Sequence, residues 1–148
     1  VVAETVKEGQ ILKMLEHLAD DYQNIIIDTQ TVLNGLMLDA LSVSDLILLV
    51  TDNSIESFDR VLSFNEMLTR NFAVEKEKIY LVVNRKKRFD FMKVWDISKM
   101  TGNPVGGFIA YDKNFDKSLC MTGVKKITGT AFYKQLCRIV ENGFTGKA

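Results

Sequence analysis

The sequence predicts an α/β fold in which a parallel sheet is covered by helices on both faces. Short apolar runs alternate along the chain with longer segments whose apolar residues recur at helical spacing. The runs are apolar throughout, which is typical of strands buried on both faces. Strands of alternating polarity, which would indicate an antiparallel sandwich, are missing from the sequence.

Composition indicates one soluble globular domain over residues 1–148, since 47% of the residues are hydrophobic and 26% are charged. No apolar run approaches the roughly 20 residues that a membrane-spanning helix requires. The two cysteines, Cys120 and Cys137, are too few and too far apart for a disulfide framework. We therefore expect free thiols and a cytoplasmic protein.

Charge is distributed unevenly along the chain, although the formal net charge is zero. Residues 1–59 hold eleven acidic and two basic side chains, and residues 60–148 hold eight acidic and seventeen basic ones. The later part could therefore meet an anionic partner.

The helices are predicted from their apolar stripes and end signals. The first expected helix carries Ile11, Leu15, Leu18 and Tyr22 on one face. Ser54 is placed to cap the third expected helix. Gly102 and Pro104 mark the end of a fourth. The second, fourth and last helices are expected at residues 33–41, 89–100 and 130–141.

Four strands are predicted, and a polar group follows each of them. The strands are expected at residues 24–28, 45–50, 78–83 and 105–110. They are followed by Asp28-Thr29, by residues 51–54, by Asn84 to Arg88, and by Tyr111-Asp112. Ligands of open parallel sheets bind outside the carboxyl ends of the strands. We therefore expect all four polar groups at one edge, where a nucleotide with its magnesium could sit.

The order of these segments resembles a known family. The chain reads YQNIIIDTQ…LDALSVSDLILLVTDN…SFDRV…IYLVVNR…VGGFIAYDKNF over roughly residues 10–142. This order is similar to the second half of a ParA/MinD-type ATPase domain, a deviant-Walker, SIMIBI-class P-loop NTPase. The family positions plasmids, division sites, flagella and pili, and it includes divergent TadZ/CpaE-type members that localise pilus or secretion machinery.

The resemblance implies roles for four residues. Asp28 resembles the catalytic Walker B aspartate, which holds magnesium through its water shell, as suits a hard carboxylate ligand. Asn84, with Arg85 beside it, resembles the residue that reads adenine, and Asp112 resembles a loop residue near the base. Two alternatives remain open: Asp28 as a cap of the next segment, and Asn84 as a turn-forming residue after a strand.

The chain also departs from the family. The phosphate-binding loop, GxxxxGK[ST] or KGGxxK[ST], occurs nowhere in it. Gln30 and Ala110 stand where the family has prolines, which puts hydrolysis in doubt. Either the loop and its strand lie upstream of Val1, or the protein is a degenerate relative that has abandoned nucleotide. We expect ATP and magnesium to bind only together with the missing loop, and the chain alone to be inactive.

Two further partners are considered. Four consecutive cations, Arg85, Lys86, Lys87 and Arg88, could contact DNA or a membrane surface, although most such runs are solvated loops. The family also implies a homodimer in the intact protein and a protein partner from a positioning or secretion system. The leading hypothesis is an incomplete, C-terminal portion of a partitioning ATPase domain, and the alternative is a non-enzymatic ATPase-like scaffold.

Overall fold

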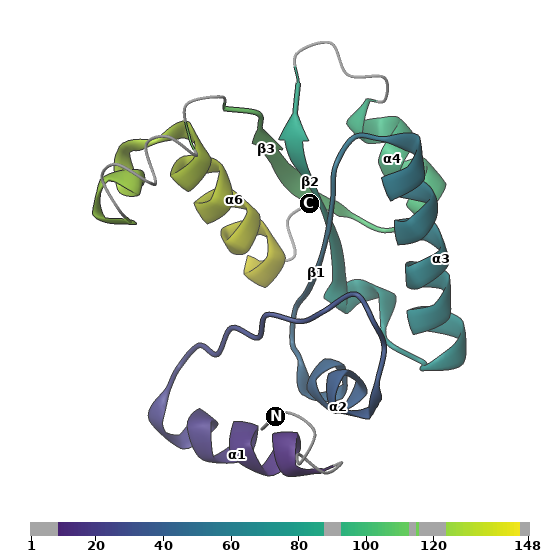
Figure 1. The fold of residues 1–148 in the computed structure, drawn as a ribbon, viewed down its shortest axis with the longest axis vertical. Coiled ribbons are helices and arrows are strands. Elements are labelled where there is room, and N and C mark those ends of the chain that lie inside the picture. Colours follow the sequence, from purple (N-terminus) through teal and green to yellow (C-terminus); the bar gives the residue numbers. More distant parts are fainter. Residues whose placement is uncertain (1–8, 88–92, 113–114, 116–123, 146–148) are drawn as a thin grey trace. The chain divides into compact units, whose positions relative to one another are not determined.

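The computed structural model divides the chain into two compact units, Val1–Asp45 and Leu46–Ala148. It describes residues 9–87, 93–112, 115 and 124–145. Figure 1 labels the helices and strands of both units.

The first unit contains two helices, α1 (Gln10–Asp21) and α2 (Gly35–Val43). The Asn34 side chain caps α2, because its Oδ1 accepts a hydrogen bond from the Met37 N–H at 2.9 Å. The Asp39 carboxylate of α2 accepts the Gly9 N–H at 2.8 Å, which ties the start of α1 to α2. The buried side chains of the two helices are Leu15, Ala40 and Leu41.

The strand predicted at residues 24–28 is wrong, because the structure has no strand there. Ile26 is 95% exposed, and the side chains on either side of it are also exposed. A β-branched run forms a strand only when its backbone N–H and C=O groups are hydrogen-bonded to a neighbouring strand. None of the described residues pairs with this run, so it belongs to no sheet.

The second unit is built on a parallel sheet of three strands in the order β1-β2-β3. The strands are β1 (Ile47–Thr51), β2 (Ile79–Lys86) and β3 (Val105–Ala110). β1 and β2 pair without interruption, whereas the pairing of β2 with β3 shifts register twice. These strands confirm three of the four predicted runs and the α/β, all-parallel class.

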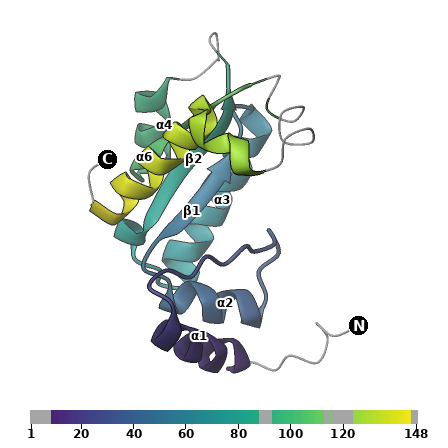
Figure 2. The ribbon, with the colours of Figure 1, turned by 90° about the vertical axis from the view of Figure 1, so that its left-hand side faces the viewer.

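Helices cover both faces of this sheet, as predicted. The chain passes from β1 through α3 (Ile55–Asn71) to β2, and from β2 through α4 (Val94–Thr101) to β3. Both helices lie on one face, as Figures 1 and 2 show. Their core joins Phe58 and Ile97 of the helices to Leu81 and Val83 of β2. Alternate residues of a strand point to opposite faces, so Val82 contributes to the other core.

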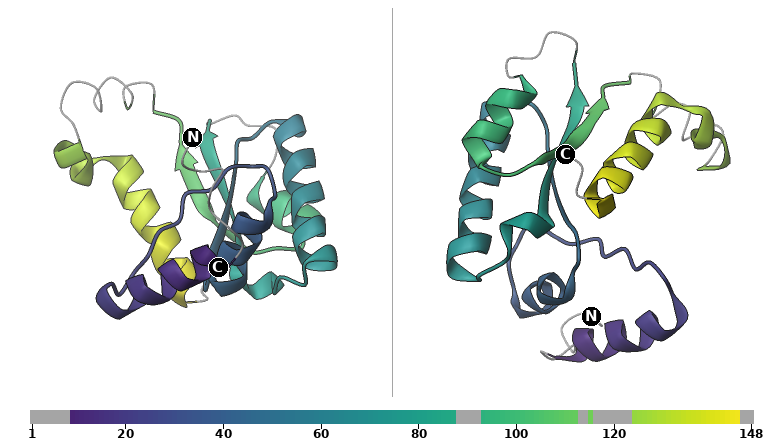
Figure 3. Two further views of the ribbon diagram at one scale, coloured as in Figure 1. Left: turned by 60° about the horizontal axis from the view of Figure 1, so that its bottom comes forward. Right: turned by 180° about the vertical axis from the view of Figure 1, so that it is seen from behind.

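The last helix, α6 (Ala131–Thr145), packs on the opposite face of the sheet (Figure 3). Its Ile139 joins Val82 and Ile109 in a second core, with Phe132 and Leu136 beside them. Two short 3₁₀ helices, η2 (Lys76–Lys78) and η3 (Val124–Gly129), precede β2 and α6 respectively. No helix among the described residues is long and apolar enough to span a bilayer.

Candidate functional site

The carboxyl ends of β2 and β3 lie side by side and carry three of the predicted site residues. Lys86 pairs with Ala110 across the two strands, and the Tyr111 N–H donates to the Lys86 carbonyl at 2.9 Å. Asn84 and Arg85 belong to the end of β2, and Asp112 follows β3 by two residues. The parallel sheet therefore places Asn84, Arg85 and Asp112 at one edge, where ligands of such sheets bind.

The backbone at the end of β2 is irregular at Arg85. Its φ is +54°, a left-handed conformation that disfavours residues with a Cβ by about 1–2 kcal/mol. The Asn84 Oδ1 accepts the Arg85 N–H at 2.8 Å and supports this conformation. The register shift between Val83 and Lys86 falls at the same point. Such irregularities are frequent at binding sites, and here the oxygen of the Asn84 carboxamide is engaged by the backbone that follows it.

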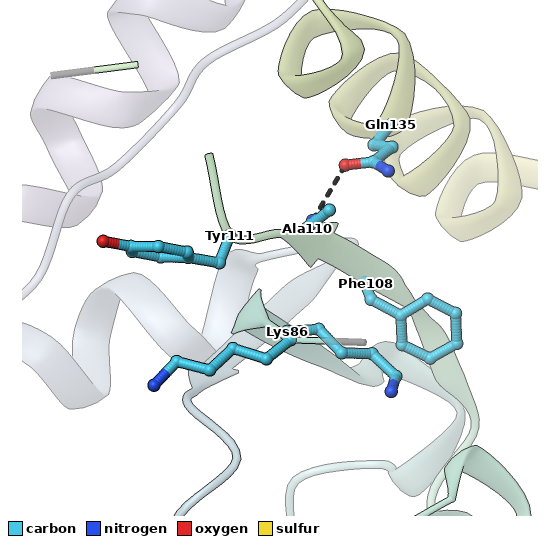
Figure 4. A pocket seen from close by; sticks show the side chains of 6 residues that line it. Lys86, Phe108, Ala110, Tyr111 and Gln135 are labelled. Atoms are coloured by element: carbon cyan, nitrogen blue, oxygen red, sulfur yellow. Dashed lines mark hydrogen bonds between the residues drawn. The ribbon is translucent and has the colours of Figure 1, made fainter. Parts of the chain in front are cut away.

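An open pocket of about 470 Å³ lies between the ends of β2 and β3 and the helix α6. Its lining residues are Lys86, Lys87, Phe108, Ala110, Tyr111 and Gln135. Figure 4 shows the Gln135 carboxamide oxygen turned toward Ala110, whose N–H it accepts at 2.9 Å. Sequence reasoning missed Gln135, which lies 25 residues after Ala110. The one signal was Ala110 itself, since an alanine has an N–H to satisfy where a proline has none.

The two lysines of the pocket are held against aromatic rings. The Lys86 Nζ lies 5.8 Å from the centre of the Phe108 ring, and the Lys87 Nζ lies 5.9 Å from the centre of the Tyr111 ring. These distances are within the range of cation–π attraction. The pocket therefore combines two positive charges with two aromatic rings, one of which, Phe108, also packs against the core formed with α3 and α4.

The turn after β1 caps α3 and places a carboxylate near Arg85. The Ser54 hydroxyl donates to Asp52 Oδ1 at 2.7 Å and accepts the Ser57 N–H at 3.2 Å. Hydrogen bonds from the side chains of Ser54 and Ser57 lower the pKa of Asp52, and the positive charge of Arg85 lowers it further. Residues 52–54 therefore form a helix-capping turn, as predicted, whereas Thr51 is the last residue of β1.

Removing the Asp52 charge is expected to weaken α3 slightly in a pH-dependent way. The lowered pKa means that Asp52 stabilises the fold above about pH 4, and that this contribution is lost as pH falls through the folded-state pKa. Because the side chain is exposed, Asp52→Asn should lower the free energy of unfolding at pH 7 by only about 0.5 kcal/mol. Chemical denaturation at pH 7 and pH 3 measures this, and an equal difference at both pH values would contradict it.

The other predicted site residues have different outcomes. Asp28 is exposed in the first unit, outside any strand, and its role stays a prediction. Arg88 lies outside the described residues. The described part of the chain has no group of three or more His, Cys, Asp or Glu side chains that could hold a metal. Asp28 alone fits magnesium only in a site completed by water and by the phosphates of a nucleotide.

The architecture matches known structures. The ParA family ATPase from Chlorobium tepidum superposes with a TM-score of 0.77 at 20% identity, over 94% of this chain and 57% of that chain. The chain has the ParA/MinD-type fold. The MinD cell division protein of Aquifex aeolicus (TM-score 0.76, 18% identity) matches 97% of this chain and 62% of its own. The cell division ATPase MinD of Pyrococcus furiosus (0.72, 20%) matches 96% and 60%.

The ParA/MinD-type fold is present only in part. The chain spans about 57–62% of the length of these structures. Neither a protein-family model nor a curated protein matches the sequence. The likeness is therefore one of fold.

Proposed function

We propose that this chain is the C-terminal portion of a ParA/MinD-type domain that binds ATP with magnesium and acts in intracellular positioning or partitioning. The observation that supports this most is the carboxyl edge of the sheet. There Asn84, Arg85 and Asp112 lie at or just beyond the ends of β2 and β3, next in sequence to the residues of a pocket lined by two cations and two aromatic rings. Planar bases bind to aromatic faces, and phosphates bind to cations.

The proposed roles follow from chemistry and position. Asp28 would hold magnesium through water, Asn84 and Arg85 would contact the base end of the nucleotide, and Asp112 would lie in the loop beside it. The bound ATP would provide the phosphate group that is cleaved off when a domain of this type hydrolyses the nucleotide.

The remainder of the site would come from a strand and phosphate-binding loop outside this sequence. β1 pairs only with β2 among the described strands, which leaves its other edge open, and residues 24–28 have no partner in the described part of the chain. A further parallel strand would supply hydrogen-bonding partners to the N–H and C=O groups of an open strand edge. We also propose that the intact protein dimerises when it binds nucleotide.

Replacing Asp28 tests the magnesium role. In the intact protein, Asp28→Asn is expected to weaken Mg-ATP binding about tenfold. The neutral amide is a poorer acceptor than the carboxylate for the hydrogen bonds of magnesium-bound water. Binding of ATP in excess EDTA should change little. Titration calorimetry with and without magnesium measures both.

Asp21→Asn is the matched control, since Asp21 is an exposed aspartate at the end of α1. It should leave binding unchanged. If the intact protein shows no magnesium-dependent ATP binding, the proposed function is wrong, and the non-enzymatic scaffold becomes the better account.

A second candidate function, binding to DNA or an anionic membrane, rests on the consecutive cations Arg85, Lys86 and Lys87 at the same edge. If it is correct, replacing all three with glutamine should abolish binding to random-sequence DNA or to vesicles rich in phosphatidylserine. Binding to DNA should also weaken steeply between about 50 and 200 mM salt. Binding that ignores salt would contradict this candidate.

A further inference from the structure

The segment that follows β3 and carries Asp112 is attached to α6 on both sides of that residue. Before Asp112, the Ala110 N–H donates to the Gln135 Oε1 of α6 at 2.9 Å. After it, the Phe115 ring lies against the Phe132 ring of α6, with the ring centres 4.3 Å apart. The Phe115 N–H also donates to the Asp112 carbonyl at 3.1 Å, which ties the second attachment to Asp112 itself.

Both attachments come from one side of α6, and α6 is itself fixed on the sheet. Phe132 and Gln135 are three residues apart, so they lie on the same side of the helix. Ile139, four residues after Gln135, is 2% exposed and packs in the core between α6 and the sheet. One side of a single helix therefore joins this core to the segment around Asp112.

The sheet holds only the beginning of this segment. The pairing of β2 with β3 ends at Lys86 and Ala110, and the Tyr111 N–H adds one bond to the Lys86 carbonyl at 2.9 Å. The Ala110 N–H bonds to α6 instead, so the end of β3 is held from two sides (Figure 4). Asp112 lies beyond the last residue of β3, and the attachments on either side of it come from α6.

We propose that Gln135 and Phe132 are positioning residues, which hold the segment around Asp112 in place at the base end of the bound nucleotide. The inference rests on the proposed function, in which Asp112 lies beside the base of ATP. Each of the two side chains acts through the segment that it holds. A segment that is already fixed loses less conformational freedom when the ligand binds, so the ligand binds more tightly.

The first test separates the base of the nucleotide from its phosphates. In the intact protein, Gln135→Leu removes the acceptor of the Ala110 N–H. Mg-ATP should then bind about fivefold more weakly, the factor that corresponds to one lost hydrogen bond. Magnesium tripolyphosphate, which has three phosphates and no base, should bind as before. Displacement of a fluorescent ATP analogue measures both affinities, and their ratio is the readout, because a general loss of stability would weaken both ligands alike.

Two further variants show whether the bond to Ala110 is the cause. Gln135→Glu is the conservative change, since a carboxylate oxygen accepts the Ala110 N–H as the amide oxygen does. It should keep the ratio of ATP to tripolyphosphate affinity, because the added charge repels both ligands. Gln23→Leu is the matched control: it makes the same change at an exposed residue of the first unit and should also leave the ratio unchanged.

Phe115→Leu tests the second attachment without altering α6. It removes the ring contact with Phe132 and should lower the ratio of ATP to tripolyphosphate affinity about threefold. Combining it with Gln135→Leu should lower the ratio further, because both attachments hold the same segment.

The outcomes separate this inference from the proposed function. An unchanged ratio in Gln135→Leu would overturn the role of Gln135, and an unchanged ratio in Phe115→Leu would overturn that of Phe132, while ATP binding itself stands. A ratio that falls equally in Gln135→Glu and Gln135→Leu would show that the bond to Ala110 is not the cause. Absence of ATP binding by the unaltered intact protein would overturn the proposed function and this inference with it. If Gln135→Leu does not fold, Phe115→Leu still decides whether α6 positions the segment.

Discussion

Replacing Asn103 with alanine is expected to lower the free energy of unfolding by about 3 kcal/mol, because it leaves buried polar groups without partners. Asn65 of α3 and Asn103, between α4 and β3, exchange two hydrogen bonds of 3.0 Å. The Asn103 Nδ2 also donates to the Ile79 carbonyl at 3.3 Å. Asn65 and Asn103 are only 6% and 3% exposed, so water cannot easily replace the lost partner.

Chemical denaturation of Asn103→Ala measures this loss, and Asn71→Ala is the control. Asn71 is the exposed last residue of α3, and its replacement should change the stability by less than about 0.5 kcal/mol. The double variant Asn65→Leu/Asn103→Leu should lose less than the sum of the two single variants, since it removes both halves of the pair. Additive losses would show that the two amides do not act as a pair.

Replacing Gly107 with alanine is expected to lower the free energy of unfolding by about 2–3 kcal/mol, because the site has no room for another methyl group. A Cβ at Gly107 would lie 2.7 Å from the Ile139 Cγ1, in the core where α6 packs on the sheet. The φ of +153° is also one that residues with a side chain rarely adopt. Both effects raise the free energy of the folded state.

Thermal or chemical unfolding of Gly107→Ala provides the measurement, with Gly129→Ala as the matched control. A Cβ at Gly129 would meet nothing within 4 Å, so that variant should keep the stability within about 0.5 kcal/mol. Combining Gly107→Ala with Ile139→Ala should cost less than the two single losses together, because the second change makes room for the first. Equal losses at Gly107 and Gly129 would contradict the close approach of α6 to β3.

The sequence predicted the parallel sheet because a strand that is buried on both faces is apolar along its whole length. A run such as residues 79–83 is apolar throughout, and the helices between the strands show their own periodicity. Residues 24–28 contain a similar apolar run, yet they form no strand. A segment belongs to a sheet only if it forms hydrogen bonds with another strand. The pattern within five residues does not show whether a partner strand lies beside them.

By itself, the sequence determined the strands of the second unit, the polar residues that follow them, and hence Asn84, Arg85 and Asp112 as neighbours of one edge. Tertiary structure alone decided that Gln135 of α6 meets Ala110 and that Gly107 must stay small beneath Ile139. The physical reason is range: a strand and its end are encoded over a few consecutive residues. The wall of a pocket and the fit of a helix on a sheet arise from residues that only packing brings together.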